Sequence, residues 1–497
     1  MSLLGIDVGT GGTRALVIDE AGRIAASTTV EHAAFASPQT GWAEQEAGDW
    51  WRATCEAVRA VLAQGEVRGA DIKCIGFSGQ MHGATLLDQH GAVLRPAIIW
   101  CDGRTDQQCR ELTEQIGAER LIDLTSNPAL AGFTLPKLLW VKKHEPEVWE
   151  RARSVLLPKD YVRWKLTGTR ATDVADASGT LLFDVQQRRW SSAMLEHTEL
   201  NVSLLPAVFE SQEVCARVSA EGARATGLME GTPVVAGAGD QAAGAVGLGI
   251  VRPGAVSATI GTSGVVFAAT DRPALDVHGR VHTFCHAIPN RWHVMGVTQS
   301  AGLSLRWFRD RFGMLSKHTE SDPYQSLMAE AALAPVGADG VIWLPYLMGE
   351  RTPHLDPHAR AALIGLTASH TRAHIIRAIL EGVAFSLRDT MTIFSEMNVP
   401  VENIRLGGGG ARAALWRQIQ ADVYGRMVEL AEAEEGAAFG AALLAGVGAG
   451  VWSSVEEACA QVVRVRERVE PDPEAARLLS ARYQVYRSLY PALRAVM

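Results

Sequence analysis

The sequence lacks the features that mark membrane proteins, disulfide-rich secreted proteins and nucleic-acid-binding proteins. No apolar run approaches the roughly 18–20 residues that a membrane span needs, and no basic tract interrupts a net charge of −8. The seven cysteines contain no C-x-x-C pair, so neither a disulfide framework nor a zinc site is indicated. An apolar strand pattern begins almost at the first residue, which leaves no room for a signal peptide. We therefore expect a cytoplasmic protein with reduced thiols and with neither a membrane nor a nucleic-acid partner.

The common nucleotide-binding motifs are absent as well. The chain contains no G-x-x-x-x-G-K-[ST] string, which excludes a P-loop, and no G-x-G continues to G-x-G-x-x-G, which excludes a dinucleotide fingerprint. The H-R-D and D-F-G strings of protein kinases are also missing. If the protein binds ATP, it must use another device.

Two glycine-rich segments that are far apart in the chain have the same pattern. Gly5–Thr13 and Ser257–Gly264 each join an apolar strand to a second apolar strand through a turn of glycine and hydroxyl residues. Glycine lets backbone N–H groups approach a ligand closely, and successive N–H groups in such a turn form a site for an anion. Each segment alone could be an ordinary β-hairpin. The repetition, with an acid in the first strand, favours a pair of turns that hold a polyphosphate.

The 497 residues are too many for one core and predict at least two domains of the α/β class. The chain alternates strands and helices in two halves, each opened by one of the two hairpins, and we place the border near 248–254. Expected strands lie at 3–8, 15–18, 72–78, 84–87, 255–268, 293–297 and 341–344, with another near residue 234. Expected helices lie at 49–64, 135–144, 239–249, 301–312, 370–398, 415–424 and from 471 to the end.

Two acids stand where phosphoryl-transfer chemistry needs carboxylates. Asp7 ends the first strand beside the first turn, where a carboxylate is suited to hold Mg²⁺; the alternative is an Asx turn that stabilises the hairpin. Asp240 follows an apolar strand and opens a helix of small residues. It could be an N-cap, and the helix N-terminus would then keep it ionised as a general base for a hydroxyl.

Two further glycine-flanked segments are candidate binding loops. Gly76–Gly83 ends a strand and contains Met81, which offers apolar surface, and His82, which offers a neutral donor and acceptor for a sugar hydroxyl. A buried structural histidine is the alternative. Leu406–Arg412 carries four glycines ahead of a helix, which would let backbone lie flat against a ligand; the alternative is a flexible turn.

Taken together, these residues resemble the FGGY carbohydrate kinases. The resemblance covers essentially the whole chain, and two long spaced patterns, Gly132–His144 and Ala361–Glu381, are its most specific parts. It implies a two-domain actin-like ATPase fold of the ribonuclease H-like type, with a nucleotide cleft between the domains. Residues 1–248 would form the ketose-binding domain and residues 249–497 the adenosine-binding domain.

The resemblance also implies a role for individual residues, with ATP and Mg²⁺ as cofactors. Asp240 would be the catalytic proton acceptor, and Asp7 would be the catalytic acid that holds the metal. The ketose would contact Met81, His82, Gly83, Asp240 and Gln241. The nucleotide would contact Thr10, Gly12, Thr13, Gly261, Thr262, Gly302, Gly408, Gly409 and Arg412.

Within the family, Gln80–Gly83 occupies the substrate loop, where glycerol kinases carry an Arg-Glu pair. The chain resembles the members that phosphorylate D-xylulose to D-xylulose 5-phosphate in xylose catabolism. Similar stretches lie at 100–104, 345–353 and 415–422. The alternatives are a kinase for L-xylulose, D-ribulose or a hexulose, and a non-kinase actin-like ATPase. Relatives are often dimers, so the expected partners are a small ketose, ATP and a second copy of the chain.

Three positions depart from the family pattern. Arg412-Ala413 stands where Lys-Ser is common, which leaves a side-chain bond to the nucleoside open. Arg14 replaces a frequent lysine, which keeps the charge and alters the reach. Ser126 replaces a frequent glycine, which we interpret as a local loop change.

Overall fold

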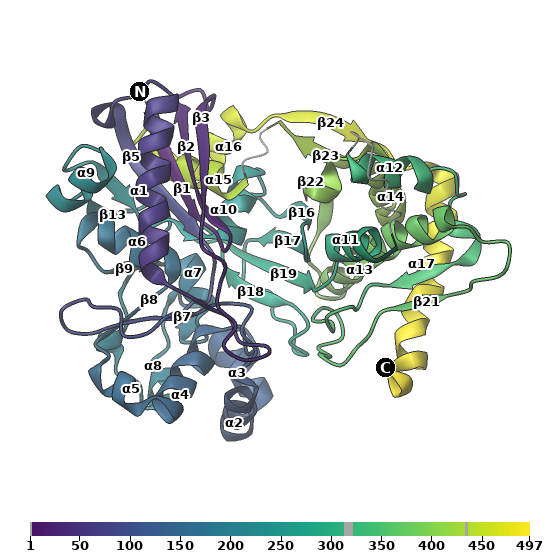
Figure 1. Ribbon diagram of the computed structural model, residues 1–497, viewed down its shortest axis with the longest axis horizontal. Coiled ribbons are helices and arrows are strands. Elements are labelled where there is room, and N and C mark those ends of the chain that lie inside the picture. The colour runs from purple at the N-terminus through teal and green to yellow at the C-terminus, as the bar shows by residue number, and fades with distance from the viewer. Residues whose placement is uncertain (1, 313–321, 433–435) are drawn as a thin grey trace.

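The computed structural model describes residues 2–312, 322–432 and 436–497 and has two lobes, each built around a seven-stranded sheet (Figure 1). The strands of the N-terminal sheet are β1 (Ser2–Val8), β2 (Gly12–Asp19), β3 (Ile24–Glu31), β5 (Ile72–Gly79), β13 (Val214–Arg217), β14 (Pro233–Val235) and β15 (Ala238–Gly239). The strands of the C-terminal sheet are β16 (Gly254–Ile260), β17 (Gly264–Thr270), β18 (His282–Cys285), β19 (Trp292–Thr298), β22 (Val401–Gly408), β23 (Val428–Ala431) and β24 (Val465–Val469).

The two sheets repeat one arrangement at their centres. β1 pairs antiparallel with β2 and parallel with β5, and β16 pairs antiparallel with β17 and parallel with β22. Each glycine-rich turn therefore lies at the end of its sheet's central hairpin. The α/β prediction and the paired hairpins are confirmed.

Smaller strands connect the helices outside these sheets. They are β4 (Glu44–Gln45), β6 (Thr85–Leu87), β7 (Ala97–Ile98), β8 (Ser154–Leu156), β9 (Ala171–Asp173), β10 (Phe183–Asp184), β11 (Arg189–Trp190), β12 (Ala207–Phe209), β20 (Ile342–Leu344) and β21 (Ala362–Ile364).

All seven helices that the sequence predicts are present, and the described residues contain ten more that it did not predict. Those of the N-terminal half are α1 (Ala47–Gln64), α2 (Asp106–Ile116), α3 (Ala118–Thr125), α4 (Thr134–His144), α5 (Pro146–Arg151), α6 (Pro158–Thr167), α7 (Val174–Ser178), α8 (Ser192–Thr198), α9 (Ala220–Thr226) and α10 (Asp240–Gly247). Those of the C-terminal half are α11 (Gly302–Phe312), α12 (Pro323–Ala331), α13 (Arg372–Glu396), α14 (Ala414–Tyr424), α15 (Gly436–Gly448), α16 (Val455–Val462) and α17 (Pro473–Leu493). None of these helices in the described residues combines the length and apolarity needed to cross a bilayer.

Helices α15 and α16 come late in the chain and yet lie in the N-terminal lobe, beside β1 and β2 (Figure 1). α15 packs on β1 and β5 because Gly5 and Gly76 lack side chains; a Cβ on either would overlap a carbonyl oxygen of α15. A Cβ on Gly440 of α15 would likewise overlap the carbonyl oxygen of Ala243 in α10. The C-terminal half therefore covers one face of the N-terminal sheet, so the division at residue 248 is a division of the sequence and only approximately one in space.

The two halves also share a core next to the substrate loop. Met81 and Phe133 from the N-terminal half are buried together with Phe267, Phe284 and Met295 from the C-terminal sheet. The loop that contains Met81 is therefore fixed by both lobes.

Candidate active site

Asp7 and Asp240 come together because three strands end at the same edge of the N-terminal sheet. Asp7 of β1 is in register with Ser78 of β5, which in turn pairs with Ala238 of β15, two residues before Asp240. The Ser78 hydroxyl donates a hydrogen bond of 2.9 Å to Asp7 Oδ1. Burial raises the pKa of Asp7, and the Ser78 bond and the charge of Arg14 only partly offset it.

The structure corrects the expected state of Asp240. Gly239 is the N-cap of α10 and Asp240 is the first helical residue, so its side chain does not cap the helix. Burial first, and then the charge of Asp7, raise the pKa of Asp240 to about 7. These two effects outweigh the helix N-terminus, and the group is poised near neutrality instead of being firmly ionised. Its Oδ1 accepts a hydrogen bond of 3.3 Å from Gln241 Nε2.

Neither acid forms an ion pair within the described residues. The nearest cation that acts on Asp7 is Arg14, whose Nε donates to Thr29 at 3.1 Å. Two neighbouring carboxylates whose pKa values are both raised by burial, and which have no ion-pair partner in the described residues, are suited to a divalent cation with oxygen ligands. The site therefore fits a metal such as Mg²⁺ at Asp7.

The substrate loop Gln80–Gly83 is held by close packing on all sides. A Cβ on Gly239 would lie 2.8 Å from Met81 Cγ, so the residue before Asp240 is flush against the Met81 side chain. A Cβ on Gly83 would come similarly close to the ring of Pro158. His82 has a left-handed backbone (φ 69°), and its carbonyl accepts bonds from Thr134 Oγ1 (3.1 Å) and Lys137 Nζ (2.8 Å).

One of the two ring nitrogens of His82 has a hydrogen-bond partner among the described residues, and the other has none. Nδ1 lies 2.7 Å from the carbonyl oxygen of Gly179. A carbonyl can only accept, so Nδ1 carries the proton and Nε2 is left as an acceptor. Burial, followed by the charge of Lys137, lowers the pKa of His82 to about 3. We expected His82 to offer both a donor and an acceptor to a sugar hydroxyl. The acceptor is present, but the donor, Nδ1–H, is already bonded to Gly179.

The first turn is reinforced by side chains from three other segments. Thr10 Oγ1 accepts a bond from Trp100 Nε1 (2.9 Å) and donates to Gln80 (3.3 Å), while its carbonyl accepts from Gln45 Nε2 (2.8 Å). The carbonyl of Gly12 accepts from Gly9 N at 3.0 Å and closes the turn.

Thr13 stays a prediction among the expected nucleotide contacts. Its side chain is fully buried in β2, and its hydroxyl lies 2.9 Å from His32 Nε2. Side chains alternate along a strand, so Thr13 lies on the opposite face of β2 from Arg14, which is in register with Asp7.

The second turn borders a cavity of about 460 Å³. Gly302 N donates to the carbonyl of Gly261, and Leu303 N to that of Thr262, so the start of α11 is bonded to the turn (2.9 and 3.1 Å). The expected nucleotide residues that line this cavity are Gly261, Thr262, Gly302, Gly409 and Arg412, together with Trp416 and Tyr324.

A second cavity of about 460 Å³ lies between the lobes and shares Gly409 and Arg412 with the first. Asp240 and Gln241 line it from α10, and Gly408 lines it from the end of β22, where its φ of 70° requires glycine. The structure therefore joins Asp240 and the C-terminal glycines in one continuous region. Thr10, Gly12 and the residues of the substrate loop do not line these two cavities.

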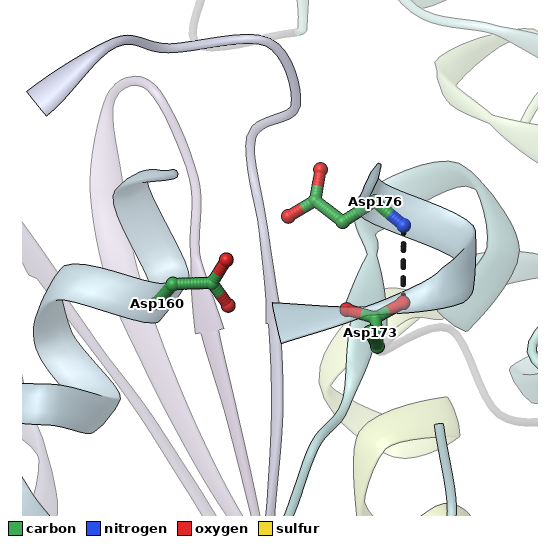
Figure 2. A group of neighbouring side chains, drawn as sticks. All are labelled: Asp160, Asp173 and Asp176. Carbon is green, nitrogen blue, oxygen red and sulfur yellow. Dashed lines mark hydrogen bonds between the residues drawn. The ribbon is translucent and has the colours of Figure 1, made fainter. Parts of the chain in front are cut away.

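A buried group of charges below the substrate loop was not recognised from the sequence. Figure 2 shows that the carboxyl groups of Asp160, Asp173 and Asp176 lie close together, with Asp176 N donating to Asp173 Oδ1 at 3.0 Å. The ammonium of Lys159 lies within 3.0 Å of an oxygen of each. Because this ammonium already supplies the central cation, we do not assign a metal here. The group anchors α7, which ends at the Gly179 that holds His82.

Two family models match the chain. The N-terminal domain of the FGGY family of carbohydrate kinases matches residues 2–247, and the C-terminal domain of the same family matches residues 256–449. The chain belongs to the FGGY family of carbohydrate kinases. The predicted two-domain actin-like fold and the predicted enzyme class are thereby confirmed.

Individual relatives match over nearly their full length. A xylulose kinase of Escherichia coli is 40% identical over 99% of both chains, and one of Bacillus subtilis is 38% identical over 98% of this chain and 96% of the relative. The crystal structure described as a xyloylose kinase from Brucella ovis has a TM-score of 0.92 and 37% identity, with all of both chains covered. As a member of this family, the protein is a carbohydrate kinase with a sugar and ATP as substrates.

Proposed function

We propose that this kinase transfers the γ-phosphoryl group of MgATP to the 5-hydroxyl of D-xylulose. The full-length similarity to proteins named xylulose kinase supports this substrate, and so does the Met81-His82 pair in the substrate loop. We further propose that it acts in the cytoplasm, where its seven free cysteines would stay reduced. The 1–248 unit would bind mainly the ketose and the 249–497 unit mainly the adenosine.

The position of Asp240 is the observation on which the proposal rests. Its carboxyl group lies between the substrate loop, through the contact of Gly239 with Met81, and the inter-lobe cavity that reaches Gly408 and Gly409. A sugar on the loop and a nucleotide along the glycines would meet at this side chain.

In the reaction, Asp240 would accept the proton of the attacking hydroxyl. A pKa of about 7 suits this role, because a base works best when its pKa lies near the working pH. Gln241 holds one oxygen of the carboxylate, so the other is left for the hydroxyl. His82 Nε2 would accept a bond from another hydroxyl of the sugar and orient it.

Asp7 would hold Mg²⁺ directly or through water, with its carboxyl group oriented by Ser78. When bound, the ion supplies positive charge to the phosphate oxygens. It would also relieve the repulsion between Asp7 and Asp240.

The two turns would hold the phosphates from opposite sides, through Thr10 and Gly12 on one and Gly261 and Thr262 on the other. The cavity bordered by Gly302 and Gly409 would take the adenosine, with the exposed Arg412 at its edge. Closure of the lobes would bring donor and acceptor together and exclude water.

The test is a coupled assay of ADP release with D-xylulose, L-xylulose, D-ribulose, D-fructose and glycerol. We expect the highest kcat/KM with D-xylulose and only a slow ATPase without sugar. A higher kcat/KM with any other sugar would replace D-xylulose as the substrate. ADP release that no sugar stimulates would contradict the kinase mechanism.

A further inference from the structure

A guanidinium group from the C-terminal half reaches the wall of the proposed sugar site. Arg351 lies in the loop between β20 and β21, and its Nη2 is 3.7 Å from the position that a Cβ on Gly132 would occupy. Gly132 belongs to the segment that holds His82, since its carbonyl and that of His82 share the ammonium of Lys137 (2.7 and 2.8 Å). Arg351 thus approaches the substrate loop from the opposite lobe.

This guanidinium has no hydrogen-bond acceptor among the residues that the structure describes. The adjacent Glu350 is turned away, because its oxygens accept from Thr298 Oγ1 (2.5 Å), Gln299 N (2.9 Å) and the backbone N of Arg351 (2.8 Å). Arg351 is partly exposed, yet it lies deep enough that burial lowers its pKa. The five N–H donors of this guanidinium are therefore open to a ligand oxygen.

Arg351 faces the His82 end of the site and not the Asp240 end. Its charge lowers the pKa of His82 and of His282, whereas the causes that shift Asp240 are burial, Asp7 and Gln241. His282 stacks on Phe284, with ring centroids 5.5 Å apart, and both imidazoles are neutral. In the described residues this wall therefore combines the acceptor His82 Nε2, the unpartnered ring Nδ1 of His282 and the donors of Arg351.

The chemistry of the acceptor sugar requires such a donor. A 2-pentulose closes its furanose ring through the 5-hydroxyl, so only the open-chain ketone has a 5-hydroxyl free for phosphorylation. That form exposes a C2 carbonyl, which can accept hydrogen bonds and cannot donate them. If the 5-hydroxyl lies at Asp240, the loop that contains His82 is next to it, because Gly239 packs against Met81, and the carbonyl end of the sugar could reach this loop.

We propose that Arg351 is a specificity-determining residue that donates hydrogen bonds to the carbonyl end of the open-chain ketose. The inference rests on the proposed function, because it assumes that the acceptor is a 2-ketopentose. It assigns part of the sugar site to the C-terminal half, so that sugar recognition depends on both lobes.

The experiment compares D-xylulose with xylitol, which has a hydroxyl in place of the carbonyl. Arg351→Met, Arg351→Lys and the control Arg360→Met are assayed for the KM of D-xylulose, the inhibition constant of xylitol and the KM of MgATP. Arg360 is an exposed arginine of the same segment, and within the part of the chain that the structure describes it donates only to the carbonyls of Pro357 and Ala359.

We expect Arg351→Met to raise the KM of D-xylulose at least tenfold, with the xylitol constant and the KM of MgATP changed by less than about threefold. Arg351→Lys should recover part of the loss, and Arg360→Met should match the unchanged protein. If Arg351→Met does not fold, Arg351→Lys serves as the test. It should then raise the KM of D-xylulose at least threefold and leave the xylitol constant unchanged. Equal losses for both sugars, or no loss for D-xylulose, would overturn the inference. If the protein without any substitution does not phosphorylate D-xylulose, the proposed function itself is overturned.

Discussion

The two hairpin turns look alike in the sequence and are held in different ways. In the first, the hydroxyl and carbonyl of Thr10 are bonded by side chains from three distant segments, those of Trp100, Gln80 and Gln45. In the second, the bonds run between backbone groups: Gly261 N to Ser263 O, and the first N–H groups of α11 to Gly261 and Thr262.

The same contrast extends to the two sides of the site. The proposed ketose side consists of buried side chains held by other parts of the chain, as in His82, whose Nδ1 is bonded to Gly179, and in the group around Lys159. The proposed nucleotide side consists largely of glycine backbone and exposed residues such as Thr262 and Arg412. Buried side chains with fixed positions select a particular oxygen of a sugar. Backbone N–H groups in a turn bind any phosphate oxygen, because the oxygens of a phosphate group are equivalent. Substitutions should therefore act through stability on the ketose side and through nucleotide affinity on the other.

The largest effect should follow from Lys159→Met on the ketose side. It leaves Asp160, Asp173 and Asp176 buried without their central cation. Breaking a buried ion pair costs about 3–5 kcal/mol, so we expect the free energy of unfolding of the N-terminal lobe to fall by about that much in a urea titration. Lys165→Met, in the same helix and with its ammonium beside Trp164, is the control and should cost less than about 1 kcal/mol. A stable Lys159→Met protein would show that these charges do not anchor the loop.

On the proposed nucleotide side, two glycines of the second turn allow the packing of the backbone to be tested with a matched control. A Cβ on Gly302 would overlap the carbonyl oxygen of Gly261, whereas a Cβ on Gly261 would have no neighbour closer than 3.7 Å. We expect Gly302→Ala to raise the KM of MgATP about tenfold with an unchanged KM for the ketose, and Gly261→Ala to change either by less than about threefold. Steady-state kinetics with each substrate varied in turn measures this. Equal effects of the two substitutions would remove the backbone account of the second turn.

A smaller effect should separate the two threonines of the turns. Thr10→Val removes the acceptor of Trp100 and the donor to Gln80, which together are worth about 1–2 kcal/mol. We expect about a tenfold loss in kcat/KM for MgATP and a lower Tm. Thr262 is exposed and donates no side-chain bond within the described residues, so Thr262→Val should leave the Tm unchanged and cost no more than about threefold. The reverse order would mean that the first turn does not depend on its side-chain bonds.

The smallest effect should be the response of ketose binding to pH. An ordinary histidine gains a proton near pH 6.5 and would then lose its acceptor. Since the pKa of His82 is about 3, its Nε2 stays an acceptor down to about pH 4. We expect the KM of the ketose to stay flat between pH 8 and 5, while kcat falls on the acid side as Asp240 becomes protonated. A rise in KM centred near pH 6.5 would contradict the assignment of the His82 proton.

Much of the fold could be predicted because its signals are local. The hairpins, the strand before Asp240 and the long helix α13 follow from apolar periodicity and turn residues within short windows. The course of α15 could not be predicted in this way. Its Gly436–Gly448 sequence is small and apolar on all sides and has no distinct face, and its contacts with Gly5 and Gly76 depend on distant glycines.

The site shows the same limit. Asp7, Asp240 and the glycine turns could be found from local motifs, but their chemical states depend on partners far along the chain. The hydrogen bond to Gly179, 97 residues away, decides which ring nitrogen of His82 is left as an acceptor. The pKa of Asp240 is raised first by its burial and then by the charge of Asp7. Lys137 and Arg351 look like ordinary basic residues in the sequence. Lys137 is distinguished by its burial against two backbone carbonyls, and Arg351 by having no acceptor for its guanidinium among the described residues.

The most direct test of the account is Asp240→Asn, assayed for ADP release with D-xylulose and for binding of each substrate by calorimetry. Asparagine keeps the size of the side chain and its place in α10 but cannot accept the hydroxyl proton. We expect kcat to fall by at least about a hundredfold, with both dissociation constants changed by less than about threefold. A variant that binds both substrates and retains more than about a tenth of the rate would show that Asp240 is not the proton acceptor.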